Sequence, residues 1–329
     1  MKLLVTGVAG FIGTNFCQYY LNQHPDDDLL GVDKLTYAGN NISVFRNNPQ
    51  CTFIKGDLAN KDFVNHLFKK HTFDGIVHFA AESHVDRSIQ DASIFIDSNI
   101  YGTFNLINCT KDNLLNNNLE DSFKYIQIST DEVYGSIEGE GKFTELTPLH
   151  PNNPYSASKA SADLLVLSYC NTYNFPGIIS RCSNNYGPYQ HKEKFIPTII
   201  LNALKHNPIP IYGDGKQIRD WIYVQDHCRA IECVLNHGKN GEIYNIGGNN
   251  EFSNNDIAAL IIHYLNKSDD SITEDLIRHI SDRPGHDRKY SMDITKIRRE
   301  LNWEPEISLS DGLKITIEYY HPNLNVLYT

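Results

Sequence analysis

The sequence lacks any long apolar segment, and this excludes one class of protein at once. A membrane-spanning helix needs about 20 mostly apolar residues, and no apolar run in this chain approaches that length. Met1 leads directly into Lys2-Leu3-Leu4-Val5-Thr6, which is typical of a strand and not of the apolar core of a signal peptide. We therefore expect a cytoplasmic protein that does not act on a membrane.

Paired cysteines and an excess of positive charge are also lacking. The seven cysteines are odd in number and irregularly spaced, and no Cys-x-x-Cys occurs. Reduced thiols are therefore favoured over a disulfide framework or a zinc site, and we expect no metal. The net charge of -11 argues against nucleic acid as a partner, because a protein that binds it carries a basic surface.

The first half of the chain alternates strand-like and helix-like segments. Composition is that of an ordinary globular protein, with 40% hydrophobic and 21% charged residues. Alternation of this kind predicts an α/β fold with a doubly wound parallel sheet of the Rossmann type, covered by helices on both faces. The apolar runs that predict strands are residues 2–6, 29–33, 52–57, 75–80, 125–130 and 177–183.

The second half has a different texture, because prolines interrupt it often and the strand–helix rhythm weakens. We predict two domains on this basis. The first spans residues 1–180 and would bind a dinucleotide. The second, smaller domain spans residues 181–329, would bind the substrate, and is partly interleaved with the first.

Three glycines follow the first expected strand and open a helix. Gly7 permits a tight turn, Gly10 lets the backbone approach a pyrophosphate, and Gly13 allows close packing of helix on strand. The free N–H groups of the helix N-terminus then face the phosphates. Three glycines also fit an ordinary turn, but the strand before them and the helix after them favour a dinucleotide-binding loop.

Two acids after the next strands indicate which dinucleotide binds. Asp33 lies about 20 residues after Gly13 at the end of a predicted strand, where a carboxylate accepts hydrogen bonds from ribose hydroxyls and repels a 2′-phosphate. This favours NAD over NADP. Asp57 lies where it could meet the adenine, although a strand-end cap explains it nearly as well.

Tyr155 and Lys159 are four residues apart, so they share one face of a helix. The pKa of a free tyrosine is about 10, and a neighbouring ammonium and a cationic nicotinamide would both favour the phenolate. A surface pair is the plain alternative. Thr130 weighs against it, because it ends a strand and strand ends line the ligand crevice of this fold. Together these residues form a set that can oxidise an alcohol.

Asp131 and Glu132 follow Thr130 directly. Two adjacent acids are usually solvated surface. These two lie at a strand end beside the expected hydride site, and the apolar residues around them would desolvate a carboxylate and raise its pKa. We therefore interpret them as an acid–base pair.

Runs over nearly the whole chain resemble the extended short-chain dehydrogenase/reductase family, and within it the sugar-nucleotide 4,6-dehydratases. The run Ser-Thr-Asp-Glu-Val-Tyr-Gly at residues 129–135 is the most specific to the dehydratases. One departure is Val8, where the family usually has a second glycine. Because Val8 precedes the pyrophosphate turn, we expect little effect. The other runs that carry the resemblance are residues 80–88, 155–159, 181–188, 212–215, 219–221, 244–248 and 282–288.

The resemblance implies two sets of binding residues. The NAD set is Gly7, Gly10, Phe11, Ile12, Gly13, Asp33, Lys34, Asp57, Leu58, Ala80, Ala81, Ser83, Ser98, Tyr155, Lys159 and Asn185. The sugar-nucleotide set is Ser83, Thr130, Asn184, Lys194, Arg219, Asn254, His286, Arg288 and Tyr290. Lys194, Arg219 and Arg288 would supply local positive charge for a diphosphate, although Lys194 by itself also fits a surface charge.

The resemblance also implies a reaction and an assembly. The reaction is NAD-dependent conversion of dTDP-glucose to dTDP-4-keto-6-deoxy-glucose. Thr130, Tyr155 and Lys159 would serve the oxidation at C4, Glu132 would remove the C5 proton, and Asp131 would protonate the departing C6 hydroxyl. The assembly is a homodimer, formed through the helix of Tyr155 and one spanning roughly residues 94–110.

Three other functions stay open. A dehydratase acting on UDP-glucose differs by one methyl group of the base, which a pocket discriminates by only about 1–3 kcal/mol. A sugar-nucleotide 4-epimerase shares the oxidising residues but needs no acid–base pair. A non-catalytic NAD-binding protein would keep the fold, but loss of Tyr155 or Lys159 would then be expected.

Overall fold

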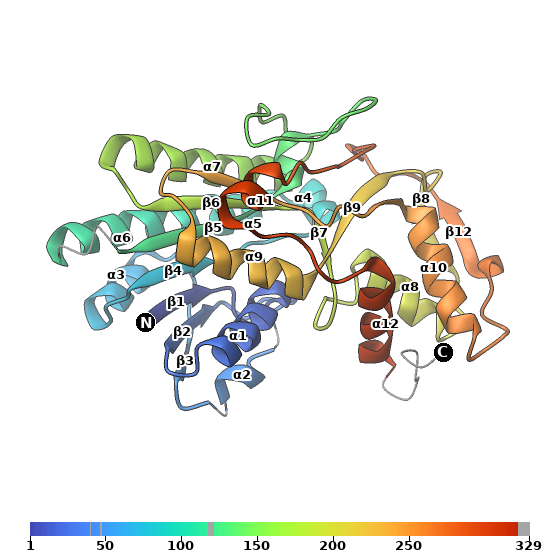
Figure 1. The fold of residues 1–329 in the computed structure, drawn as a ribbon, viewed down its shortest axis with the longest axis horizontal. Helices are drawn as coiled ribbons and strands as arrows, with labels where there is room; N and C mark the ends of the chain where they lie inside the picture. Colours follow the sequence, from blue (N-terminus) through green and yellow to red (C-terminus); the bar gives the residue numbers. More distant parts are fainter. Residues whose placement is uncertain (40, 47, 118–121, 322–329) are drawn as a thin grey trace.

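A computed structural model describes residues 1–39, 41–46, 48–117 and 122–321. Its centre is a seven-stranded parallel sheet in the order β10-β6-β5-β4-β1-β2-β3 (Figure 1). The order 3-2-1-4-5-6 within it is that of a dinucleotide-binding Rossmann sheet, so the predicted doubly wound fold is confirmed. The strands are β1 (Lys2–Thr6), β2 (Asp28–Asp33), β3 (Cys51–Lys55), β4 (Gly75–His78), β5 (Lys124–Thr130), β6 (Gly177–Cys182) and β10 (Ile243–Ile246).

All six predicted strands are present, but three of them end earlier than predicted. β3 stops at Lys55 and not at residue 57, β4 at His78 and not at residue 80, and β6 at Cys182 and not at residue 183. In each case the residues beyond leave the sheet and turn into a cleft at its edge. The sequence pattern missed β10, because only four residues pair there, in register with β6 from Ile243 opposite Ile179.

Helices cover both faces of this sheet. On one face α1 (Phe11–Gln23) packs with α9 (Val224–His237) around a core that includes Phe16 and Ile231. The opposite face carries α3 (Lys61–Lys70), α6 (Gly102–Asn117) and α7 (Pro154–Tyr173). The remaining elements around the sheet are α2 (Ser43–Arg46), α4 (Val85–Gln90), α5 (Ser93–Phe95), the π-helical turn η1 (Ile96–Tyr101), the 3-10 turn η2 (Asp131–Tyr134) and α11 (Thr295–Leu301).

A smaller group of elements lies beside the carboxyl end of the sheet, with its own apolar core (Figure 1). It contains a three-stranded sheet in the order β11-β9-β7 and a parallel pair of β12 and β8. Its elements are β7 (Asn184–Tyr186), α8 (Phe195–Ala203), β8 (Ile209–Tyr212), β9 (Ile218–Tyr223), β11 (Glu251–Ser253), α10 (Asn254–Asn266), η3 (Glu274–Leu276), β12 (Ile277–Ile280) and α12 (Leu309–Tyr320). Because α9, β10 and α11 return to the large sheet, the two halves of the chain interleave. The domain boundary at residue 180 stays a prediction.

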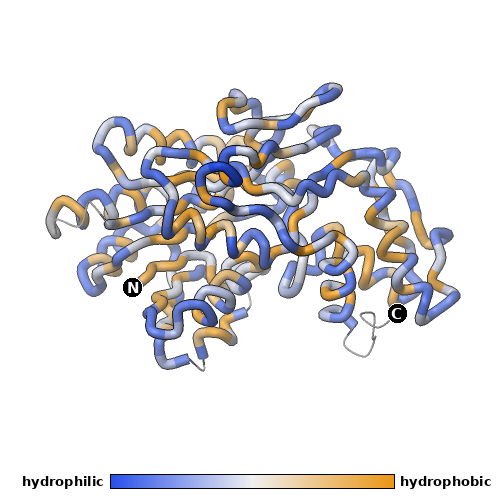
Figure 2. Tube along the Cα trace, in the orientation of Figure 1, coloured by the Kyte–Doolittle hydropathy of each residue, from blue (hydrophilic) through white to orange (hydrophobic). Residues whose placement is uncertain are grey.

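Apolar residues are distributed in short stretches throughout the molecule. Figure 2 shows them alternating with hydrophilic residues along the helices. Within the described ranges, no helix combines the length and the apolar character that crossing a bilayer requires. All seven cysteines are unpaired thiols.

Candidate active site

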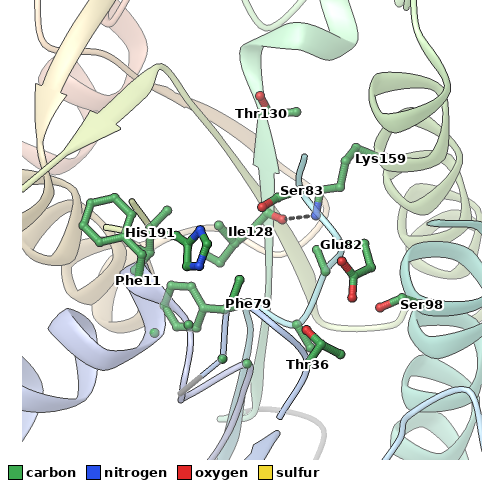
Figure 3. A pocket seen from close by; sticks show the side chains of 18 of the residues that line it. Phe11, Thr36, Phe79, Glu82, Ser83, Ser98, Ile128, Thr130, Lys159 and His191 are labelled. Atoms are coloured by element: carbon green, nitrogen blue, oxygen red, sulfur yellow. Dashed lines mark hydrogen bonds between the residues drawn. The ribbon is translucent and has the colours of Figure 1, made fainter. Parts of the chain in front are cut away.

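A long cleft runs along the carboxyl ends of the central strands (Figure 3). Parallel strands end at the same edge of a sheet, and ligands of this fold bind where the strand order reverses, here between β1 and β4. Four of the strands deliver residues to this edge: Gly7 follows β1, Asp33 ends β2, Phe79 follows β4, and Thr130 ends β5. The sheet therefore brings residues far apart in the sequence into one site.

The glycine loop has the geometry that its sequence predicts. Gly7 adopts φ +73°, and a Cβ there would lie 2.6 Å from the backbone nitrogen of Ala80. A Cβ on Gly13 would lie 2.2 Å from the carbonyl oxygen of Gly7. Gly10 directly precedes α1, so the free N–H groups of that helix face the cleft. Val8, which stands where the family usually has a second glycine, lies in the apolar core and does not line the cleft.

Asp33 is oriented by the backbone around it. Its carboxylate accepts hydrogen bonds from the N–H groups of Ala9 (3.0 Å) and Leu35 (2.7 Å). Burial nevertheless raises its pKa, and these two bonds only partly oppose that effect. Asp57 accepts a hydrogen bond from the N–H of Ala59 (2.9 Å) and pairs with Lys34 at 2.6 Å. Both acids line the cleft beside the glycine loop.

α7 carries Tyr155 and Lys159 into the cleft, and its N-terminus is well capped. The Asn153 side chain accepts a hydrogen bond from the N–H of Ser156 (2.9 Å), and Pro154 occupies the first turn. Lys159 is buried and donates to the carbonyl oxygen of Ile128 at 2.7 Å (Figure 3). This hydrogen bond ties α7 to β5 near the carboxyl end of the strand.

A buried asparagine on the π-helical turn η1 links two walls of the cleft. The amide of Asn99 accepts from the N–H of Glu82 (2.8 Å) and donates to the Ser158 hydroxyl (2.8 Å). Ser98, its neighbour on the turn, lines the cleft. Such π-helical turns are often found at functional sites, and this one holds the segment after β4 against α7.

Burial is the largest influence on the pKa of Tyr155. In the chain by itself it lies well above its ordinary value, because the phenol is buried and the carboxylate of Glu132 is close. The hydroxyl of Thr130 acts in the opposite direction. The Lys159 ammonium, which donates to Ile128, does not offset the effects that raise this pKa.

Thr130, Asp131 and Glu132 form the turn at the end of β5. The Thr130 hydroxyl accepts from the N–H of Glu132 (3.3 Å) and donates to Asp131 (3.2 Å). Asp131 is only 2% exposed, and its second carboxylate oxygen is buried without a hydrogen-bond partner among the described residues. Glu132 is half-buried and accepts from the Asn153 amide at 3.4 Å.

The two acids lie in different electrostatic environments. Burial raises the pKa of Asp131 well above its usual range, and the nearby carboxylates of Glu132 and Asp220 raise it further. Burial also raises the pKa of Glu132, but Arg283, Arg219 and Lys194 oppose that shift. Asp131 is therefore the better proton donor of the pair, and Glu132 the better proton acceptor.

Most of the predicted site residues lie in this one cleft. The whole predicted NAD set lines it, and so do Ser83, Thr130, Asn184 and Lys194 from the substrate set. Lys194 donates to the carbonyl oxygen of Ser83 at 2.8 Å. The Ser183 hydroxyl and the Asn184 amide oxygen are among the buried polar atoms at the cleft that lack partners in the described part of the chain.

Five predicted substrate residues do not line the cleft. Arg219 and Tyr290 are buried together, with the guanidinium 4.2 Å from the ring centre, and both interact electrostatically with Glu132. Asn254 is buried at the start of α10. The Nδ1 of His286 lies 2.6 Å from the Oδ1 of Asp282. Arg288 is half-exposed and pairs with Asp214 at 2.9 Å, so this expected cation lies at the surface.

The sequence did not single out Arg283, whose charge acts on Glu132. Its guanidinium lies 3.5 Å from Asp86, and its charge is the strongest opposing influence on the pKa of Glu132. Arg283 and Arg288 both belong to the run at residues 282–288, and spacing alone does not tell which of them acts on Glu132. The residues that line the cleft without having been indicated by the sequence include Thr36, Tyr37, Gln190, His191 and Glu193.

No cluster of three or more metal-ligating side chains occurs among the residues whose placement is described. The groups that converge on the cleft are a phenol, an ammonium, a hydroxyl and two carboxyls, beside a glycine loop. This set suits hydride transfer to a dinucleotide together with proton transfer.

Comparison with known proteins supports this chemistry. The sequence model of the family described as GDP-mannose 4,6 dehydratase matches residues 4–316. The dTDP-glucose 4,6-dehydratase of Xanthomonas campestris pv. campestris is 44% identical, over 97% of this chain and 93% of that protein. The dTDP-glucose 4,6-dehydratase of Streptomyces venezuelae, solved with NAD bound, superimposes with a TM-score of 0.91 at 43% identity over 98% of each chain.

A solved epimerase shares the fold at lower identity. The UDP-glucuronic acid 4-epimerase of Bacillus cereus, solved with UDP-glucuronic acid and NAD, superimposes with a TM-score of 0.86 at 31% identity. The match covers 98% of this chain and the whole of that one.

Proposed function

The chain belongs to the GDP-mannose 4,6 dehydratase family, and from that premise we propose that it is an NAD-dependent hydro-lyase that converts dTDP-glucose to dTDP-4-keto-6-deoxy-glucose. One observation carries the proposal: an acid–base pair, the buried Asp131 and the half-buried Glu132, adjoins Thr130 and Tyr155 in the same cleft as the glycine loop. An enzyme that only oxidises and reduces an alcohol does not need this pair.

NAD fits the residues present. Gly7 and Gly13 leave no room for a side chain, so the backbone approaches closely where a pyrophosphate would lie. Asp33 would hold the adenosine ribose, and its negative charge disfavours a 2′-phosphate. Lys159 would bind the nicotinamide ribose side of the cleft. When bound, NAD accepts a hydride from C4 of the sugar and later returns it to C6.

In the oxidation step the chain handles one proton. Tyr155 takes the proton of the sugar O4, and Thr130 holds that oxygen in place. Because burial and Glu132 raise the pKa of Tyr155, the phenolate needs both Lys159 and the positive charge of the oxidised nicotinamide. The loss of that charge on reduction favours the neutral phenol, which retains the proton.

In the elimination step the two acids act on neighbouring carbons. The C4 ketone makes the C5 proton acidic, and Glu132 removes it. Asp131 gives its proton to the C6 hydroxyl, which leaves as water. The charges around the two acids support this division of labour, since two carboxylates and one arginine act on Asp131, whereas three cationic side chains act on Glu132. A proton then returns to C5 as the hydride returns to C6.

Three further properties belong to the proposal. Unpaired cysteines suit the cytoplasm, and the net charge of -11 argues against nucleic acid or an anionic membrane as partner. A homodimer through α6 and α7 is supported by exposed apolar side chains on these helices and on the turn before them. They include Tyr101, Phe104 and Leu164.

The experiment is single turnover with dTDP-glucose, followed by NADH absorbance. The wild type should show transient NADH and form a 4-keto product, whereas Asp131→Asn should accumulate NADH because water loss is slowed by on the order of 100-fold. Abolished hydride transfer in a folded Asp131→Asn chain would contradict the assignment. Steady-state turnover of dTDP-, UDP- and GDP-linked glucose identifies the base, and interconversion at C4 without water loss would indicate an epimerase.

A further inference from the structure

The segment from Cys182 to Asn185 forms the wall of the cleft next to the acid pair. It leaves the large sheet at the end of β6 and enters the smaller one at β7. All four of its residues line the cleft, and Cys182 lies opposite Thr130 in the strand register. Any shift of this segment therefore moves the surface that faces Thr130.

The amide of Asn185 is used entirely inside the protein. Its Nδ2 donates to the carbonyl oxygen of Ser183 (3.0 Å) and to the Sγ of Cys182 (3.3 Å). The Cys182 thiol donates in turn to the carbonyl oxygen of Ser129 at 3.3 Å. The amide thus closes the segment on itself and ties it to the residue before Thr130.

The Oδ1 of Asn185 lies 2.9 Å from Nδ1 of His227 on α9. Because Nδ2 of the amide already donates to Ser183, Oδ1 is an acceptor, and Nδ1 of the imidazole carries the hydrogen. His227 is fully buried, and burial lowers its pKa to about 3, so the ring is neutral. Its Nε2 is then a bare lone pair, buried without a partner in the described structure.

This unpaired lone pair lowers the stability of the folded chain. A buried acceptor without a partner opposes folding, and an apolar side chain of similar size on α9 would not carry one. The neighbours of His227 on this helix, such as Cys228 and Val234, are buried and contribute to the apolar core. What the imidazole supplies and they do not is the Nδ1–H directed at Asn185.

We infer that His227 is a positioning residue, which holds the Asn185 amide in one orientation and so fixes the cleft wall beside Thr130. Without this donor the amide is free to turn, and its oxygen would then face the carbonyl oxygen of Ser183. The inference rests on the proposed function only for its activity measurements.

The test compares three variants on the same helix. His227→Leu removes the donor. His227→Asn restores one near the place of Nδ1. Val234→Ala is the matched control, since it weakens the same buried face without reaching the cleft. Each is tested for NAD affinity by fluorescence titration without substrate, for NADH formation in single turnover with dTDP-glucose, for KM, and for thermal unfolding.

We expect His227→Leu to form NADH on the order of 10- to 100-fold more slowly, with KM changed less than twofold. His227→Asn should recover most of the rate, and Val234→Ala should lower only the unfolding temperature. The inference is overturned if His227→Leu is no slower than Val234→Ala, or if His227→Asn is no faster than His227→Leu. If His227→Leu does not fold, His227→Phe takes its place, and failure of both to fold overturns it too, because the imidazole would then be needed for stability.

The NAD titration separates this inference from the proposed function. If the wild type converts no sugar nucleotide, the proposed function fails. Weaker NAD binding in His227→Leu than in Val234→Ala would then still support the positioning role. Equal affinity in the two variants would overturn it.

Discussion

At the scale of one residue, the buried carboxyl of Asp131 in the candidate active site lowers the stability of the folded chain. Its carboxyl is 2% exposed, and one oxygen has no partner among the described residues. Burial, then Glu132 and Asp220, raise its pKa well above the ordinary value. The folded chain therefore binds this proton more tightly than the unfolded chain does. Stability is lost as pH rises from about 4, the unfolded value, through the raised folded value.

Asp131→Asn removes that loss, because an amide does not titrate. We expect the variant to match the wild type near pH 4 and to exceed it by about 0.5–2 kcal/mol at pH 8, while water loss is impaired. Urea unfolding at both pH values measures the difference, with Asp26→Asn as a surface control. An equal difference at the two pH values would contradict the role given to ionisation.

At the scale of the element, the start of α7 serves stability and chemistry together. Asn153 caps the helix that carries Tyr155 and Lys159, and its amide also reaches Glu132 at 3.4 Å. That second contact is one of the influences that oppose the rise in the pKa of Glu132 caused by burial. The same side chain therefore fixes the helix and helps to keep the base ionised.

Two substitutions separate these roles. Asn153→Ala should cost about 1 kcal/mol of unfolding free energy through the lost cap, whereas Asn153→Ser keeps a capping oxygen and should stay near the wild type. Both lose the contact with Glu132, so its pKa rises further and activity should appear only at higher pH in both. Urea unfolding and a pH profile of turnover provide the two readings. A serine variant as unstable as the alanine variant would count against the cap.

At the scale of the whole molecule, charge and apolar surface are unevenly placed. The chain is acidic overall, yet Lys194, Arg219 and Arg283 all act on Glu132 at the cleft. An anionic substrate therefore meets local positive charge.

Along α6 and α7, which pack side by side, Phe104 and Leu164 leave apolar surface exposed, as expected of a face that meets a second copy.

Leu164→Glu should convert a dimer to a monomer, because it places two charges in the proposed interface, one from each copy. Sedimentation velocity at micromolar concentration measures the change. Leu146→Glu is the control, since Leu146 is 93% exposed and lies on neither helix. A wild type that sediments as a monomer, or a Leu164→Glu variant that stays dimeric, would show that these helices do not form the interface.

The sequence by itself determined what depends on local backbone geometry and short-range period. Gly7, Gly10 and Gly13 indicated a dinucleotide-binding turn between a strand and a helix, and the spacing of Tyr155 and Lys159 placed both on one helix face. Six strands followed from apolar runs, with ends misplaced by one or two residues where the chain turns into the cleft. Asp131 and Glu132 stood out because they follow a strand end.

Only the tertiary structure decided which distant groups meet. β10, from the second half of the chain, joins the large sheet by pairing with β6. The sequence did not reveal this strand, because four residues are too short a pattern and the pairing is a long-range contact. The charge of Arg283 acts on Glu132, whereas Arg288 pairs with Asp214 at the surface. The unequal pKa values of Asp131 and Glu132 arise from neighbours far along the chain, such as Asp220 and Arg283. Burial and charge act through space, and the order of residues does not record those distances.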